Sequence, residues 1–486
     1  MNRSIVSNLQ LIFILCLCAS PLCTTLPGEW RQLYTQTSNR QPEIVIVNKP
    51  LALSQQPAPL VTPYDVFQLQ TIYHHASPSG PIPGLFRKLE LSNQGDMLRN
   101  DPFMSQGYHV NVQRGAIYRP VSLEYLYDMY RYQQHHDDRA ILTWTSMMDH
   151  GITFDYYLTQ GMLPDVSHKS SVLALAMMAR NAYHDKIDDR GDWYDLGAPW
   201  NLNESFGWES DGIRGHVFGN RDKSIFIISI KGSSSGKTRH NDSINEKLLF
   251  SCCCGNEDHN EQQPTCDCKM NENACDNRCL ENHIKGSEFY YDMAMRIYKD
   301  ISDRHPQSTI WLTGYSLGGA VASIVGQTFL VPIVSFGIPG DQFAARKLHL
   351  PHAPGLPLPV WHFGHTADPI FAGKCSNVDG GCGDYIAETQ CHTGKVCEWD
   401  TVKDKGWDAS LQHHQIEDMI EYLLKDEESS LPECKPENNE CNDCGQWQYF
   451  DSRDQPAPHH SSTPTPSPTH TTSTPANPGP TICSWW

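Results

Sequence analysis

The feature that most constrains the fold is a glycine-flanked serine between two differently patterned apolar segments. Residues 310–313 form a short apolar run typical of a buried strand, and residues 317–329 are small and apolar, as in a buried helix. Gly314-Tyr315-Ser316-Leu317-Gly318 lies at their junction. A strand that turns sharply into a helix at such a sequence exposes the serine hydroxyl, and the glycines let the backbone segments cross closely. We therefore predict that Ser316 is a nucleophile.

The same pattern occurs a second time, at residues 232–236, with Ser234 in the central position. It also follows a strand-like run, but residues 237–242 after it are polar and resemble a loop. A loop does not supply the helix that this turn requires. The context therefore favours Ser316 over Ser234.

A serine hydroxyl needs a base, and the base needs a carboxylate that orients it. In α/β-hydrolases these groups follow the serine in the order Asp, then His. Asp368 comes just after the strand predicted over residues 358–363, so we predict that it is the carboxylate. His413 and His414 directly precede the last predicted helix, and spacing does not separate them as candidates for the base. The other downstream histidines are expected to be structural or on the surface: His362, His365 and His392.

The oxyanion that forms during acyl transfer needs backbone N–H donors, one of them from the residue after the nucleophile. That residue is Leu317. The second donor comes from a loop after an earlier strand, and Ser233 follows the strand-like run that ends at Ile230. We predict Leu317 and Ser233 as the oxyanion hole, with a plain Gly-Ser turn as the alternative for Ser233. This chemistry requires no metal and no cofactor.

Strand-like and helix-like patterns alternate around the serine. Strands are predicted over residues 224–230, 310–313, 331–336 and 358–363, and helices over residues 169–183, 288–301, 317–329 and 415–425. Such alternation favours an α/β fold with a mostly parallel sheet wrapped by helices.

The cysteines indicate an oxidising compartment. The chain has 18 of them, and residues 252–282 combine many cysteines with few apolar side chains. We predict that this segment is an insertion held by its own disulfides. Zinc is the competing interpretation for the spacings Cys266-Asp-Cys268 and Cys275-x-x-x-Cys279, but no second C-x-x-C and no H-x-x-x-H accompanies them.

The ends of the chain differ from its middle. Residues 9–23 are the only long apolar run, and its core is shorter than the roughly 20 residues that a spanning helix needs, which favours a cleaved signal peptide. Residues 24–100 show no sustained periodicity, and residues 451–486 are rich in Ser, Thr and Pro, as in a disordered tail. The net charge of −19 argues against a nucleic-acid surface. Asn203 and Asn241 begin N-glycosylation sequons.

Several motifs resemble a known family. IKGS at 230–233, GYSLGGA at 314–320, SFGIPG at 335–340 and ADPIF at 367–371 resemble the class 3 lipases of the α/β-hydrolase superfamily. FSCCC at 250–254, CDC at 266–268 and ETQCHTGK at 388–395 resemble, more narrowly, the fungal autophagy-related lipases that break down autophagic bodies in the vacuole. The resemblance covers roughly residues 160–425.

The resemblance implies more than the composition does. It implies a single-pass type II membrane glycoprotein that passes through multivesicular bodies and the endosomal membrane to the vacuole lumen. It also implies membrane phospholipids and triacylglycerol as substrates, a Ser316-Asp368-His414 triad, and Ser233 in the oxyanion hole. The matching organisation is a cytosolic N-terminus (1–8), a signal-anchor (9–23), a luminal lead-in (24–150), a lipase domain (151–450) and the tail (451–486).

Two other hypotheses stay open beside an autophagic lipase. A secreted or luminal esterase acting on soluble or cell-wall esters gains support if residues 9–23 are cleaved. A non-catalytic luminal membrane-binding glycoprotein is a hypothesis of another class, and the complete set of Ser, Asp and His candidates argues against it.

Overall fold

The structure is a computed structural model. It describes residues 43–46, 64–75, 86–90, 107–124, 126–127, 153–183, 213–233, 239–250, 268–271, 274–276, 279, 290–348, 350, 358–376, 390–437 and 448–450. The predicted signal segment, the predicted tail, Asn203, Ser234 and most of the cysteine-rich insertion lie outside these ranges.

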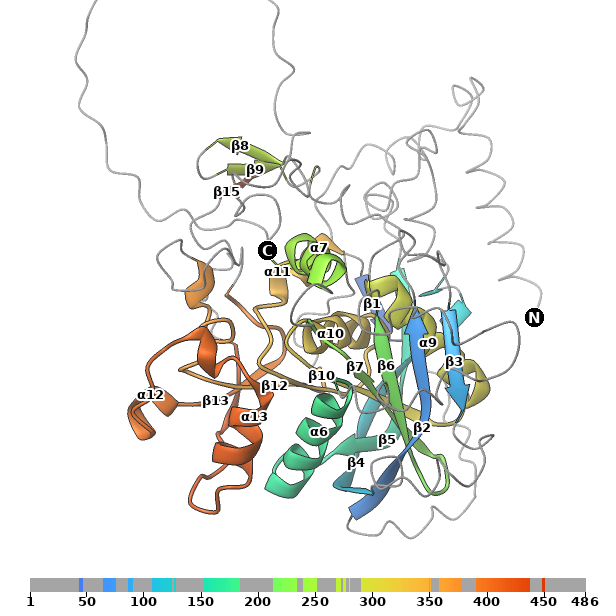
Figure 1. Cartoon of the computed structure of the whole chain (residues 1–486). Coiled ribbons are helices and arrows are strands. Elements are labelled where there is room, and N and C mark those ends of the chain that lie inside the picture. The colour runs from blue at the N-terminus through green and yellow to red at the C-terminus, as the bar shows by residue number, and fades with distance from the viewer. Residues whose placement is uncertain are drawn as a thin grey trace, which may run out of the picture.

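One large sheet forms the centre of the described part, with helices on both of its faces (Figure 1). Its strand order is β1-β5-β4-β2-β6-β7-β10-β11-β12-β13-β14, and β3 pairs with β2. The strands are β1 (Glu43–Ile46), β2 (Tyr64–His75), β3 (Phe86–Glu90), β4 (Tyr108–Pro120), β5 (Thr153–Pro164), β6 (Arg214–Asn220), β7 (Ile225–Ile230), β10 (Thr309–Tyr315), β11 (Ile333–Phe336), β12 (Val360–His365), β13 (Lys395–Trp399) and β14 (Cys434–Pro436). A smaller sheet contains β8 (Lys269–Asn271), β9 (Ala274–Asp276) and β15 (Gln448–Phe450).

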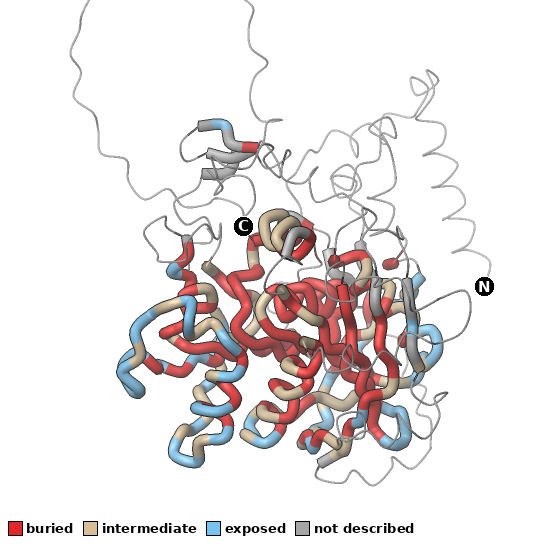
Figure 2. The backbone as a smooth tube through the Cα atoms, viewed as in Figure 1, coloured by how far each residue is buried: buried red, intermediate tan, exposed pale blue. Residues whose placement is uncertain are grey.

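The strands from β7 to β13 run parallel, and this region carries the predicted nucleophile. Every residue of β7 is buried, because its side chains alternate between two apolar clusters on opposite faces. Ile228 and Ile230 belong to one cluster, whereas Ile225 and Ile227 belong to the other. Figure 2 shows that buried backbone is concentrated in these central strands. The fold class predicted from the alternating pattern is confirmed.

The helices divide between the two faces. Helices α9 and α10 pack in the first cluster, and helix α6 packs in the second together with the last helical segment. The helices are α6 (Lys169–Asn181), α7 (Arg239–Leu249), α9 (Tyr290–Arg304), α10 (Leu317–Phe329), α11 (Gln342–Lys347), α12 (Thr401–Asp404) and α13 (Ile416–Met419), with the 3-10 turns η5 (Lys374–Ser376) and η6 (Leu411–His413) and the π-helix η7 (Ile420–Leu424). The four predicted helices are confirmed, and the last of them continues as a π-helix.

The predicted lead-in is wrong for part of its length. Strands β2 and β4 lie within the predicted lead-in, yet they belong to the main sheet, where β2 pairs antiparallel with both β4 and β6. Phe67 and Tyr73 of β2 are fully buried there. This part of the sheet is antiparallel, so the sheet is parallel at its centre rather than throughout. The boundary predicted near residue 151 therefore separates strands that share one sheet.

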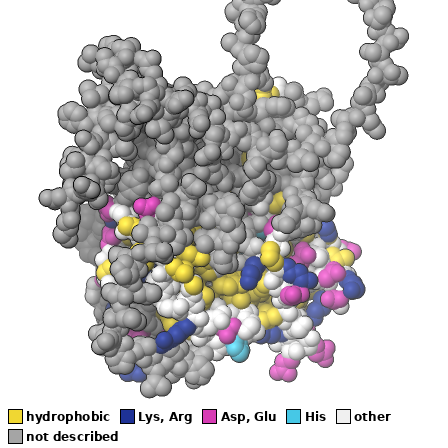
Figure 3. All heavy atoms as spheres, turned by 180° about the vertical axis from the view of Figure 1, so that it is seen from behind, with side chains coloured by type: hydrophobic (Ala, Val, Ile, Leu, Met, Phe, Trp, Pro, Cys, Tyr) yellow, Lys and Arg dark blue, Asp and Glu magenta, His cyan; other side chains and the backbone are white. Residues whose placement is uncertain are grey.

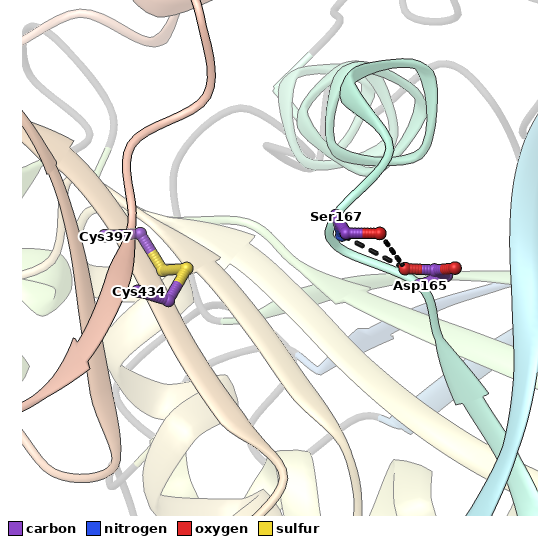
Figure 4. The surroundings of a disulfide bond; sticks show 4 residues. All are labelled: Asp165, Ser167, Cys397 and Cys434. Atoms are coloured by element: carbon purple, nitrogen blue, oxygen red, sulfur yellow. Dashed lines mark hydrogen bonds between the residues drawn. A yellow bond between two sulfur atoms is a disulfide. The ribbon is translucent and has the colours of Figure 1, made fainter.

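Disulfides and a hydrogen-bonded turn stabilise segments outside the active site. Cys397 of β13 is bonded to Cys434 of β14, and the Asp165 carboxylate accepts hydrogen bonds from the amide and hydroxyl of Ser167 just before α6 (Figure 4). Cys268 and Cys279, one from each of the two spacings considered for zinc, form a disulfide with each other. In the part of the chain that the structure describes, no helix is long and apolar enough to cross a membrane.

Candidate active site

Ser316 occupies a strained turn between β10 and α10. Its backbone has φ 54° and ψ −133°, a combination that non-glycine residues rarely adopt. The Ser316 amide donates to the carbonyl of Phe336 on the neighbouring strand, with 3.0 Å between nitrogen and oxygen. The predicted strand-to-helix context of this serine is therefore present.

The two glycines of the motif are required by close backbone contacts. A β-carbon on Gly314 would lie 2.6 Å from the carbonyl carbon of Gly318. A β-carbon on Gly318 would lie 2.2 Å from the carbonyl oxygen of Ile230 and 2.5 Å from the amide nitrogen of Gly232. Real β-carbons do not approach other atoms so closely, so both positions exclude a side chain. These contacts also press the turn against the loop that follows β7.

Three predicted site residues meet at the carboxyl ends of the parallel strands. His414 Nε2 lies 2.9 Å from Ser316 Oγ, and His414 Nδ1 lies 2.9 Å from Asp368 Oδ2. Because an ionised carboxylate only accepts hydrogen bonds, Nδ1 carries the proton and Nε2 accepts the serine hydroxyl. The side chains of Asp368 and His414 are 2% and 14% exposed, so this chain of hydrogen bonds is largely shielded from water.

Asp368 is held from several directions. It follows β12, and its Oδ1 accepts from the amides of Ile370, at 3.0 Å, and Phe371, at 3.4 Å. Its second oxygen is thereby left for His414. Gly337 has φ 53°, and a β-carbon there would lie 3.3 Å from Asp368 Oδ2 and 2.8 Å from the Tyr315 ring.

The two adjacent histidines, His413 and His414, contact different groups in the structure. His413 Nδ1 lies 2.9 Å from Asp418 Oδ2, and its ring stacks on Trp407 with ring centroids 4.6 Å apart. His414 alone of the two reaches Ser316. The other histidines are buried at different positions, where His362 contacts Ser335, His365 contacts Thr401, and His392 contacts the carbonyl of Ile338.

The predicted oxyanion donors lie on adjoining segments. Leu317 is the first residue of α10, so its N–H has no carbonyl partner within the helix. The loop with Gly232 and Ser233 packs on Gly318 in the same turn. The Ser233 hydroxyl, however, donates to the carboxylate of Glu246 on α7. In this arrangement the backbone N–H of Ser233, rather than its hydroxyl, is the group available as an oxyanion donor.

The predicted glycosylation of Asn241 disagrees with the structure. This asparagine lies in helix α7 and is only 2% exposed. A glycan needs a side chain that reaches solvent, so the burial argues against modification in the folded state.

Sequence reasoning missed two polar side chains beside the site. Glu246 is 13 residues from its partner Ser233, and no motif marks it. Tyr183, just after α6, donates through its hydroxyl to the carbonyl of Tyr315, at 3.0 Å. The apolar periodicity that predicts α6 gives no information about this hydrogen bond, which lies just beyond the end of the helix.

The fold and the strand-to-helix turn define an α/β-hydrolase. The comparisons narrow this class, because residues 227–331 match the model of the family Lipase (class 3). A protein of Kluyveromyces lactis named "Putative lipase ATG15" is 42% identical over 323 residues, covering 63% of this chain and 60% of the relative. A protein of the same name from Saccharomyces cerevisiae is 42% identical, over 60% of this chain and 58% of the relative. Another, from Eremothecium gossypii, is 38% identical, over 68% of this chain and 62% of the relative.

The chain thus spans about 60% of the length of these curated relatives. Among solved structures, the Lip2 lipase of Yarrowia lipolytica is 17% identical with a TM-score of 0.22, covering 39% of this chain and 61% of that chain. The Rhizomucor miehei lipase propeptide complex is 12% identical with a TM-score of 0.25, and the match covers 50% of this chain and 77% of that chain. The resemblance to class 3 lipases, and to the fungal relatives within them, is confirmed by the sequence matches.

Proposed function

We propose that this chain is a lipase that hydrolyses acyl esters of membrane phospholipids, triacylglycerol or both through Ser316, His414 and Asp368. The observation that carries the proposal is the continuous hydrogen-bonded chain from Ser316 Oγ through His414 to Asp368, with 2.9 Å at each step. Its order along the sequence is that of α/β-hydrolases. The names of the relatives support the same reaction.

The geometry leads to a two-step reaction without a metal. His414 Nε2 takes the Ser316 proton as Oγ attacks the ester carbonyl carbon, and the N–H groups of Leu317 and Ser233 bind the oxyanion. His414 then returns this proton to the departing alcohol oxygen, which leaves an acyl-serine. Water, deprotonated by His414, attacks the acyl carbon, and collapse releases the fatty acid and restores Ser316. Asp368 keeps the His414 proton on Nδ1 and stabilises the imidazolium.

A lipid substrate agrees with the surface beside the base. Leu411 and Tyr422, in the segments around His414, are 37% and 56% exposed, and Val402 in α12 is 41% exposed. Figure 3 shows apolar side chains gathered on the rear face of the described part, next to acidic and basic groups. Contiguous exposed apolar patches, rather than single exposed residues, mark surfaces that meet lipid or other partners.

The cellular part of the proposal rests on the motifs that resemble the fungal autophagy-related lipases. A lipase of this kind would act in the vacuole lumen after passage through multivesicular bodies, and it would lyse autophagic bodies and intraluminal vesicles. In this proposal residues 9–23 anchor it as a single-pass type II protein. Microscopy of a tagged chain, with protease protection of the tag, tests both the compartment and the orientation.

The catalytic proposal is tested on the purified chain with phospholipid vesicles and triacylglycerol emulsions at pH 5 and pH 7. Ser316→Ala should lower turnover by about four to six orders of magnitude. Ser234→Ala, in the other Gly-x-Ser-x-Gly sequence, is the matched control and should retain most of it. Equal losses in both variants would exclude Ser316 as the nucleophile. Hydrolysis of soluble esters alone would favour an esterase, and vesicle binding without hydrolysis would favour the non-catalytic hypothesis.

A further inference from the structure

We propose that Tyr183 is a positioning residue, whose hydroxyl joins the nucleophile turn to the oxyanion loop. The inference rests on the proposed function of Ser316 and deepens it. No sequence motif marks this tyrosine, which lies two residues beyond the end of α6.

One hydroxyl group makes both connections. The Tyr183 O–H donates to the carbonyl oxygen of Tyr315, at 3.0 Å, and Tyr315 immediately precedes the nucleophile. The backbone of Gly232, which immediately precedes Ser233, packs directly against the same hydroxyl. The hydroxyl therefore holds one catalytic segment by a hydrogen bond and is in close contact with the other.

The space around this hydroxyl is tightly filled. A β-carbon on Gly232 would lie 2.0 Å from the Tyr183 oxygen, 2.5 Å from the carbonyl oxygen of Tyr315 and 2.9 Å from the amide nitrogen of Gly318. Three chain segments thus cross at one point: the end of α6, the loop after β7 and the nucleophile turn. Such a crossing transmits any shift of the tyrosine to both the nucleophile and the oxyanion donor.

The tyrosine ring is fixed as well. It lies 5.9 Å from the Tyr315 ring, tilted by 58°, and the Lys231 ammonium is 5.5 Å from its centroid. Burial raises the pKa of Tyr183 well above its ordinary value, and the carboxylate of Asp242 acts in the same direction. The hydroxyl therefore keeps its proton throughout the pH range of the assays, and the bond to Tyr315 persists.

The consequence for catalysis follows from the backbone of Ser316. Its φ of 54° lies in a region that side chains rarely adopt, so surrounding contacts must impose it. The peptide between Tyr315 and Ser316 is held at its carbonyl by Tyr183. The amide of that same peptide is held by Phe336. Removal of the hydroxyl frees the carbonyl end of this peptide and leaves a gap beside Gly232, which loosens the two reacting sides of the site relative to each other.

A matched tyrosine elsewhere separates positioning from simple stabilisation. Tyr156 is buried in the core and donates to the carbonyl oxygen of Thr328, at 2.8 Å. Its hydroxyl bond is of the same type as that of Tyr183, but its partner is in helix α10 near its far end from Ser316. Tyr156→Phe should therefore lower stability without altering the reaction.

The experiment uses the full chain with Tyr183→Phe, Tyr156→Phe and Ser316→Ala. Hydrolysis of p-nitrophenyl butyrate gives kcat and KM, and a p-nitrophenyl phosphonate gives the rate of serine inactivation. Thermal unfolding followed by circular dichroism gives the folded fraction, to which each rate is referred. Tyr183→Phe should lower kcat and the inactivation rate by about 10- to 100-fold, because a misplacement of about 1 Å can cost as much as 100-fold. KM should change by less than about 2-fold, since ester binding is left intact.

Tyr156→Phe should keep kcat and the inactivation rate within about 2-fold of wild type, with a comparable loss of thermal stability. If the two phenylalanine variants have the same kcat and inactivation rate, Tyr183 is only a structural residue and the inference is overturned. If Ser316→Ala remains active, the proposed function itself fails, which is a different result from an unchanged Tyr183→Phe with an inactive Ser316→Ala.

Discussion

His362→Gln is expected to weaken the pH dependence of folding stability. The His362 side chain is completely buried, with Nδ1 2.6 Å from Ser335 Oγ and Nε2 3.7 Å from Asp341 Oδ2. Burial disfavours the charged ring and lowers the pKa of His362 to about 4, although the nearby Asp341 acts in the opposite direction. Glutamine retains an amide that can accept the Ser335 hydroxyl, but it does not titrate.

The sign and size of the effect follow from proton linkage. An ordinary histidine titrates near pH 6.5, so between about pH 6.5 and pH 4 the unfolded chain binds more protons at this position than the folded chain. Stability from neutral His362 is therefore present at pH 7 and is lost as the pH falls through this window. With a folded pKa of about 4, lowering the pH from 7 to 5 removes about 2 kcal/mol.

The measurement is urea unfolding of wild type and His362→Gln at several pH values from 7 to 5. The wild type should lose about 2 kcal/mol more than the variant over this range. His392, whose pKa is raised despite its burial because Glu437 faces it, contributes with the opposite sign in both proteins. His109→Gln, at an exposed position on β4, is the control and should follow the wild type. Parallel curves for wild type and His362→Gln would refute the assignment of a buried, neutral ring.

Two further predictions concern the base and the disulfide. His414→Ala should lower kcat/KM on a soluble ester by about four to six orders of magnitude, whereas His413→Ala should change it by less than about 10-fold; similar losses in both would contradict the separation of their contacts. Replacing Cys397 and Cys434 together by serine should lower the unfolding free energy in urea by about 2–4 kcal/mol, because the bond closes a loop with a sequence separation of 37. A double variant as stable as the wild type would show that this bond adds nothing to folding.

The centre of the fold could be predicted because its signals are local. Helix α10 begins and ends at the predicted residues, 317 and 329, since its small and apolar side chains suit a helix that is buried on all sides. The strand before it is also recognisable, because a parallel strand covered on both faces is buried throughout and mostly apolar. Ser316 and Asp368 could then be placed by their positions at strand ends, which the topology brings to one edge of the sheet.

The antiparallel half of the sheet escaped prediction because its partners are distant in sequence. In β2, Phe67, Leu69 and Tyr73 are buried, but polar residues interrupt them, and the residues of β6 that pair with β2 come at least 140 positions later. Its alternating apolar and polar residues suit a strand, but they do not show which distant segment will pair with it. The burial of Asn241 has the same origin, because a sequon says nothing about which face of a helix packs against the protein.

Sequence spacing could not identify which of the two adjacent histidines is the base, whereas the local backbone geometry does. Both precede α13, and either could supply an imidazole at this point of the chain. The 3-10 turn η6 ends at His413, and His414 leaves it with φ −78° and ψ 68°, so the two rings contact different neighbours. His413 is held by Asp418 and Trp407, while His414 faces Ser316. Because His413 fixes the segment from which His414 extends, the pair is not redundant, and neither ring can replace the other without rebuilding the turn.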